Sequence, residues 1–250
     1  MSTHALDDDR WFVVDDDWEA QRSAARALLA TRRDDVVAGS AVDAAAAVDA
    51  EITAWLDDRG VDASAVPDTD ALVAARSRVA DDLCVLLPSD GRWLLAAGAV
   101  CFPSLWRLDQ KIGRPLDDVH EPVPGYAGAL ASRVDGFLGR LGPGRTVWRR
   151  NWSIHADDAL FVPEHSVRDE LPPPDERWLR SERQTLRRLR DVDAVAFTIR
   201  TQQVPLAALA SRPDVCTALV AAVRAWSPAQ RAYKGHAVDD ALLQWLGRAR

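Results

Sequence analysis

The apolar positions in the first third of the chain recur at helical spacing. In the segment 17–33, apolar residues share one face among strong helix formers, and Asp17 is suited to cap the helix. Similar alanine-rich patterns predict helices over 41–58 and 70–80. We therefore expect a mainly helical N-terminal part after an irregular entry over 1–16.

The pattern changes at Asp82, where short apolar runs replace the helical spacing. The runs 83–87 and 93–102 flank a turn with Asp-Gly at its centre. Asp and Gly tolerate the left-handed backbone conformation that a tight two-residue turn needs, so this segment predicts a β-hairpin.

Two further segments alternate as strands do. Over 146–154, alternate positions place Arg149 and Asn151 on one face. Over 194–201, Arg200 lies on the opposite face from its apolar neighbours. These two segments predict strands with a polar face.

The remaining patterns are mostly helical. Helices are expected over 126–141 and in most of 204–250. The segment 178–189 fits either a charged helix or a strand with a polar face, and its pattern does not decide between them. About five strands around one central helix give an α+β fold with a mainly antiparallel sheet. We divide the chain into an N-terminal helical extension (1–80), a sheet core (81–205) and C-terminal helices packed on the core (206–250).

Composition and charge exclude several classes of protein. The 250 residues carry a formal net charge of -7, which argues against broad nucleic-acid binding. No apolar run is long enough for a membrane-spanning helix, and the acidic N-terminus lacks the pattern of a signal peptide. Cys84, Cys101 and Cys216 form no C-x-x-C pair, so we expect reduced thiols in the cytoplasm and no iron–sulfur or Cys-rich zinc site in this chain.

His120 is the histidine with the most defined local setting. It follows a short helical stretch and precedes Pro122 and Pro124, which favour extended geometry in the residues before them. We expect it on the last turn of that helix or just past it, with its ring direction fixed by the following segment. Imidazole is a common metal ligand, but a histidine near a helix end also serves as a cap. The other histidines, His4, His155, His165 and His236, show no metal-ligand spacing.

Arg149 and Arg200 each lie inside otherwise apolar or aromatic runs. A buried guanidinium needs several acceptors, because an unpaired buried charge is costly. Both arginines therefore have two readings. One is structural, as a pair with Glu182 or part of an exposed sheet face, and the other is an anion clamp.

Six pieces of the chain, spanning roughly 80–235, occur together in one known family. They are D-L-C-V-L-L (82–87), F-P-S-L-W-R-L-D-Q-K-I-G-R-P-L-D-D-V-H-E-P-V-P-G-Y (102–126), R-R-N-W-S-I (149–154), E-R-Q-T-L-R-R-L (182–189), F-T-I-R-T (197–201) and Y-K-G (233–235). With them the chain resembles the haem-dependent oxidative N-demethylase-like family. That family was first described as a domain of unknown function and is related to the haem subunit of dimethylamine monooxygenase.

The resemblance implies a PAS-like antiparallel sheet with helices that binds haem b. It implies O2-dependent demethylation of a small methylated amine such as dimethylamine, with release of formaldehyde. The electrons would come from a reductase whose FMN and [2Fe-2S] cluster are carried on partner subunits. Oxidoreductase activity, a small amine, O2 and a separate reductase are thus the expected activity and partners, with no nucleic acid and no membrane.

The resemblance also implies roles for individual residues. It places the iron ligand at His120, with Lys111, Arg114 and Tyr126 as further cofactor-binding residues, the first two at the haem propionates. The implied catalytic residues are Arg149, Asn151, Glu182 and Arg200, and one of the two arginines would stabilise oxygen at the iron. Gln202 stands where the family often has an aromatic residue, and would line the substrate end of the pocket.

Two alternatives stay open. One is a haem-binding PAS-type sensor or storage module without turnover, and the other is a subunit that has lost its haem. The sequence also leaves open the exact substrate, which of the two arginines lies beside the iron-bound oxygen, and whether the chain assembles into an oligomer.

Overall fold

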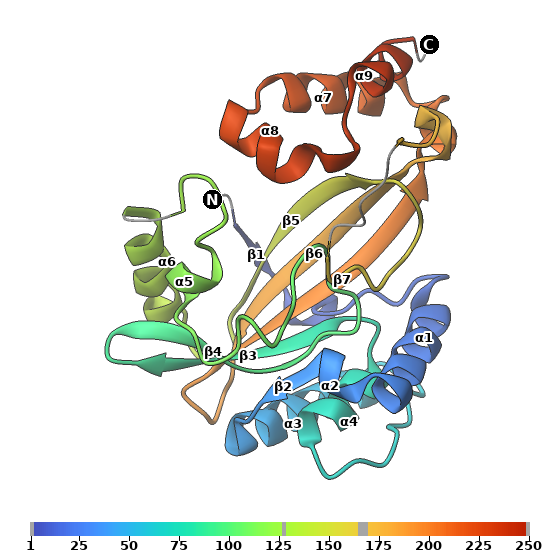
Figure 1. Ribbon diagram of the computed structural model, residues 1–250. Coiled ribbons are helices and arrows are strands. Elements are labelled where there is room, and N and C mark those ends of the chain that lie inside the picture. The colour runs from blue at the N-terminus through green and yellow to red at the C-terminus, as the bar shows by residue number, and fades with distance from the viewer. Residues whose placement is uncertain (1–2, 127–128, 165–169, 249–250) are drawn as a thin grey trace.

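One antiparallel sheet organises the molecule in the computed structural model, which describes residues 3–126, 129–164 and 170–248 (Figure 1). Within these residues the sheet has seven strands in the order β1-β5-β6-β7-β3-β4-β2. The strands are β1 (His4–Leu6), β2 (Val37–Gly39), β3 (Asp82–Ser89), β4 (Arg92–Ala99), β5 (Thr146–His155), β6 (Trp178–Arg188) and β7 (Val195–Pro205).

The helices lie in three groups around the sheet. The first holds α1 (Trp18–Thr31), α2 (Arg33–Val36), α3 (Val42–Asp57) and α4 (Ala71–Arg78). The second holds α5 (Leu116–Val119) and α6 (Ala129–Arg140), and the third holds α7 (Pro213–Arg224), α8 (Pro228–Lys234) and α9 (Asp240–Leu246). Short 3-10 turns are η1 (Asp8–Arg10), η2 (Pro174–Glu176), η3 (Leu206–Leu209) and η4 (Gly235–Ala237). In Figure 1 the first and third groups lie at opposite ends of the long strands.

Strand β3 is covered on both faces. Leu83 and Val85 pack into the cluster formed with the N-terminal helices, whereas Cys84 and Leu86 pack into the cluster formed with α5 and α6. Successive side chains of a strand point to opposite faces, so a strand covered on both sides is a continuous apolar run. The sheet therefore has one face beneath the N-terminal helices and one beneath α5 and α6.

The expected hairpin is confirmed. β3 and β4 pair antiparallel up to Ser89 and Arg92, and the two turn residues, Asp90 and Gly91, have φ angles of 49° and 77°. Positive φ at both central positions gives a turn whose twist matches the strands, and Asp-Gly tolerates it.

The open segment 178–189 is a strand. β6 pairs with β5 on one side and with β7 on the other. The hydrogen-bond acceptors of its buried arginines lie in chain segments that pack on the sheet. Arg183 donates to the carbonyl of Trp11, and Arg187 donates to the carboxylate of Glu51. The charged side chains of this strand therefore bind the N-terminal segments to the sheet, and they do not form a solvated helix face.

The C-terminal helices form a separate apolar cluster. Leu206, Cys216, Leu219, Val220 and Leu242 pack with Ile154 at the end of β5. An ion pair between the buried Arg177 and the partly exposed Asp239 ties this group to the sheet, because both terminal nitrogens of Arg177 lie 2.8 Å from the carboxylate.

The mixed helix and antiparallel sheet class is confirmed, and the helices expected over 17–33, 41–58 and 70–80 are α1, α3 and α4. The N-terminal part is less purely helical than expected. The edge strands β1 and β2 both come from it, and β1 lies within the stretch expected to be irregular. Each is three residues long, too short for a periodic pattern. Within the described residues, no helix combines the length and apolarity needed to cross a membrane.

Candidate functional site

His120 is positioned by a segment that folds back onto β4. The amide of Gly113 donates to Leu95 O at 2.7 Å, and the amide of Leu95 donates to Arg114 O at 3.0 Å. These bonds hold the start of the short helix α5, and His120 is the residue directly after it, as expected from the sequence. The sheet edge thus fixes the helix that carries the imidazole.

The imidazole of His120 has a defined tautomer. Its Nδ1 lies 2.7 Å from Leu116 O, and a carbonyl oxygen only accepts, so Nδ1 carries the proton. Nε2 then carries the lone pair. Burial lowers the pKa of His120, with smaller effects in the same direction from Lys111 and Arg149, whereas the bond to Leu116 opposes them. A neutral imidazole with one nitrogen held by a carbonyl and the other able to ligate is the usual form of a metal-binding histidine.

Two turns and an aromatic contact hold the ring of His120. The amide of Val123 donates to His120 O at 2.8 Å, and the amide of Tyr126 donates to Val123 O at 3.1 Å. The turns bring Tyr126 onto the imidazole with ring centroids 4.3 Å apart and planes 12° apart. Gly125, with φ of 79°, takes a backbone conformation that suits glycine. The bond to Leu116 and the contact with Tyr126 therefore hold the direction of the ring.

The two cations expected at the haem propionates have different surroundings. Lys111 is half-buried and its Nζ donates to Val119 O beside His120. Burial lowers the pKa of Lys111, with a further contribution from Arg114. Arg114 itself is exposed and contacts Gln110 O at 3.4 Å and Glu121 at 4.0 Å. Only Lys111 lies close to the imidazole.

A polar row crosses β5 and β6 on the sheet face that α5 and α6 cover. Arg149 pairs in register with Gln184, and Asn151 with Glu182, so these side chains share one face. The nearly buried Glu182 accepts from Asn151 Nδ2 at 3.4 Å and from Gln184 Nε2 at 3.1 Å. Its other oxygen lies 3.4 Å from Arg180 Nε. The Glu182 carboxylate is thus surrounded by hydrogen-bond donors.

Arg149 connects this row to His120. Its charge lowers the pKa of His120 and opposes the rise in the pKa of Tyr126, which burial raises to about 12. Burial lowers the pKa of Arg149 itself, and Glu182 counteracts that effect. The structure therefore brings together Arg149, Asn151, Glu182, His120 and Tyr126 from the expected set.

Arg200 does not join this group, and Gln202 does not line it. Arg200 is completely buried on the opposite face of the sheet, where it donates to the side chains of Gln21 and Asp15. Gln202 also bonds to Asp15, at 3.1 Å. Alternation along β7 turns Arg200 away from the face that carries Glu182, and the N-terminal segment supplies its acceptors. Its contacts are those of a structural ion pair, and they separate Arg200 from the other residues expected to be catalytic.

The C-terminal helices add residues that our sequence analysis gave no role. Lys234, the last residue of α8, donates to Asn151 Oδ1 at 2.8 Å and to Trp152 O at 3.3 Å. The neighbouring Tyr233 has a pKa raised by burial and by Glu182. The only sequence signal was that both belong to the Y-K-G piece of the resemblance.

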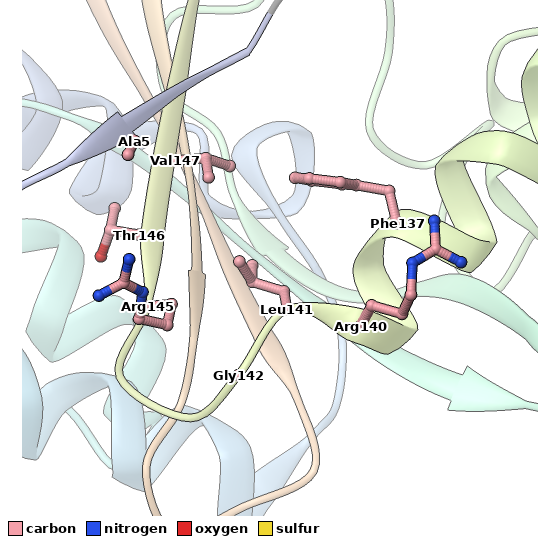
Figure 2. Close-up of a pocket in the computed structure, with 8 residues that line it drawn as sticks. All are labelled: Ala5, Phe137, Arg140, Leu141, Gly142, Arg145, Thr146 and Val147. Carbon is pink, nitrogen blue, oxygen red and sulfur yellow. The ribbon is translucent and has the colours of Figure 1, made fainter.

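A cavity of about 240 Å³ opens between α6 and β5, and none of the expected site residues lines it. Figure 2 shows Phe137 and Val147 pointing toward each other across it, with Arg140 and Arg145 at its edges. Val147 precedes Arg149 by two positions and so shares its strand face. A second cavity, of about 270 Å³, lies between β2, α3 and β4 and contains none of the expected site residues in its lining.

The site holds one imidazole able to ligate and several cations, whereas the described ranges contain no group of three or more His, Cys, Asp or Glu placed to hold a metal ion. His165, which the sequence placed at a loop, lies outside the described residues. Fold and site thus define an α+β protein in which the imidazole of His120, at the end of α5, lies beside a cationic, carboxylate-centred row on one sheet face.

Comparison with known families agrees with this arrangement. A family model described as haem-dependent oxidative N-demethylase, alpha subunit-like, matches residues 49–243. The chain belongs to that family. The match contains β3 to β7, α5, α6 and α8, and therefore every residue of the site described above.

Proposed function

We propose that this chain is the haem-binding subunit of an oxidative N-demethylase that acts on a small methylated amine such as dimethylamine. The observation that carries the proposal is the 2.7 Å bond from His120 Nδ1 to Leu116 O, which leaves Nε2 as the ligating atom. Membership of the family supports the assignment.

The residues present fit a haem. Its porphyrin supplies four nitrogens to the iron, so one protein imidazole is a sufficient proximal ligand. His120 would be that ligand, and the stacked Tyr126 would hold its orientation. The cations Lys111 and Arg149, which both lower the pKa of His120, suit a group that carries two carboxylates.

When bound, the haem supplies the iron at which O2 is reduced. The overall reaction takes two electrons and two protons: one oxygen atom leaves in formaldehyde with the methyl carbon, and the other leaves as water. Arg149 contributes positive charge in a half-buried position, where it stabilises developing negative charge more strongly than in water. Glu182, oriented by Asn151 and Gln184, accepts a hydrogen bond from the amine nitrogen.

The arrangement of the long strands supports a PAS-like core over 81–205. The hairpin of β3 and β4 is followed by helices on one face and then by the three strands β5, β6 and β7, of which the last pairs with β3. In this proposal 1–80 and 206–250 flank that core. The family description as an alpha subunit supports partner subunits, which would carry FMN and [2Fe-2S] and supply the electrons. Three buried, unpaired cysteines suit the reducing cytoplasm.

The test uses the purified chain reconstituted with haem. We expect a Soret band, and then formaldehyde formation that depends on dimethylamine when a reductant and air are supplied. A Soret band without formaldehyde would leave the alternative of a haem-binding sensor or non-catalytic subunit. A colourless preparation after reconstitution would exclude both haem functions.

A further inference from the structure

Lys234 makes two contacts with β5 from the end of α8. Its Nζ donates to Asn151 Oδ1 at 2.8 Å and to Trp152 O at 3.3 Å. The first of these contacts determines how the Asn151 amide is oriented. An ammonium group only donates, so the atom of Asn151 that faces it is the oxygen, and the Nδ2 end of the amide points the other way.

The Nδ2 end of the Asn151 amide points to Glu182. Nδ2 lies 3.4 Å from Glu182 Oε2, which is long for a hydrogen bond, so this contact alone holds the amide weakly. The 2.8 Å contact with Lys234 has an ordinary length and supplies the second point of attachment. With its amide held at both ends, Asn151 donates to the same carboxylate oxygen as Gln184, and the two donors together orient Glu182.

The C-terminal helices have attachments to the sheet other than Lys234. Their apolar cluster packs against the end of β5, and Arg177 on β6's first turn of chain pairs with Asp239. Within Pro228–Lys234, which the structure describes completely, no side chain is buried, and a capping box closes the first turn of α8. Removal of the Lys234 ammonium should therefore leave these helices folded on the sheet, which urea denaturation checks.

We propose that Lys234 is a positioning residue for the Glu182 carboxylate and acts on it through Asn151. The inference rests on the proposed function, in which Glu182 accepts a hydrogen bond from the amine nitrogen. In this role Lys234 contacts neither the amine nor the haem. It keeps Asn151 Nδ2 on Glu182 and so keeps the carboxylate turned toward the amine. Without the ammonium the Asn151 amide rotates freely, and Gln184 alone holds that oxygen.

The first measurement needs neither haem nor amine. The side-chain amide protons of Asn151 are observed by NMR in the full-length apo-protein and assigned by their loss in Asn151→Ser. Because Nδ2 donates to Glu182, Glu182→Gln should shift these resonances in the wild-type background. In Lys234→Met, which keeps the apolar stem and has no donor, most of that shift should be absent.

Arg231→Met is the matched control for this measurement. Arg231 is an exposed cation on the same helix and donates to Val223 O, so its replacement should preserve the full shift. An equal response to Glu182→Gln in wild type and in Lys234→Met would overturn the inference, because Asn151 would then face Glu182 without Lys234.

The second measurement is the affinity for dimethylamine, by spectral titration of the haem-reconstituted protein. Lys234→Met should weaken binding per folded molecule about three- to tenfold, as expected when one hydrogen bond is lost. In the Glu182→Gln background it should have no further effect, because the two residues act through one path. An effect of Lys234→Met that persists undiminished in that background would also overturn the inference.

Chemical rescue tests whether the ammonium itself is responsible. Alkylation of Lys234→Cys with 2-bromoethylamine rebuilds an ammonium at nearly the original length and should restore the affinity. The three native cysteines are buried, and burial raises their pKa, so they react slowly. If the NMR result is as expected but dimethylamine does not bind, or no haem is taken up, the proposed function fails while the positioning of Glu182 by Lys234 stands.

Discussion

Arg76 and Asp82 form an ion pair in which neither side chain is exposed, with Arg76 Nε 3.0 Å from Asp82 Oδ1. The same carboxylate accepts from the amide of Cys101 at 2.8 Å and from the amide of Phe102 at 2.9 Å. One side chain thus ties the end of α4 to the start of the segment that leads to His120. The pair belongs to the scaffold that positions the site.

Replacement of Asp82 should therefore destabilise the whole fold. Asp82→Ala leaves the Arg76 guanidinium and two amides without their acceptor, and we expect the free energy of unfolding to fall by about 3–5 kcal/mol. Urea denaturation measures the loss. Asp68→Ala, which breaks the more exposed pair with Arg33, should cost less than about 1 kcal/mol. Equal losses in the two variants would contradict this reading.

The role of His120 can be tested by removing its side chain and then adding free imidazole to the solution. We expect His120→Gly to lose the Soret band after haem reconstitution, because the proximal ligand is gone. Added imidazole should restore the band, since it fills the space beside Tyr126 and supplies the same nitrogen. His4→Gly, near the N-terminus, is the control and should keep the band without imidazole. An unchanged spectrum for His120→Gly would reassign the iron ligand.

The same substitution should lower activity at Arg149 and stability at Arg200. Arg149→Gln removes positive charge beside His120, so we expect amine-dependent formaldehyde formation to fall about a hundredfold while the Soret band remains. Arg200→Gln removes a fully buried guanidinium and leaves the partly exposed Asp15 without its cation, so it should lower the free energy of unfolding by about 1–3 kcal/mol. The activity that remains per folded Arg200→Gln molecule should match wild type. The opposite ranking of the two variants would show that the catalytic arginine had been assigned to the wrong sheet face.

Local patterns explain which parts of this site could be read from the sequence. Alternation along β5 correctly placed Arg149 and Asn151 on one face, because a strand has a fixed period of two. Alternation also put Arg200 opposite its apolar neighbours, but it could not say which face the N-terminal segment would cover. The contact between Lys234 and Asn151 joins residues 83 positions apart, and no spacing rule predicts it. The charged strand β6 stayed ambiguous because its arginines find their acceptors in distant segments.

Asp81 should make stability depend on pH. Its carboxyl is completely buried, accepts from Thr198 Oγ1 at 3.3 Å, and has no partner for Oδ2 within the described part of the chain. Burial raises its pKa from 3.8 to about 6, although Arg200, Arg183 and Arg76 oppose the rise. Between these two values the folded state holds a proton that the unfolded state has lost. Stability from this group is therefore complete below the lower value and is lost as the pH rises through the higher one.

Asp81→Asn removes that titration while keeping the shape of the side chain. The difference in free energy of unfolding between Asp81→Asn and wild type should grow with pH across the window from 3.8 to about 6, by about 3 kcal/mol in total. Urea denaturation at several pH values from about 4.5 to 7 measures most of this change. Because other carboxylates titrate in both proteins, only the difference between them is diagnostic. A difference that stays constant with pH would show that Asp81 is ionised in the fold throughout this range, with the surrounding arginines outweighing its burial.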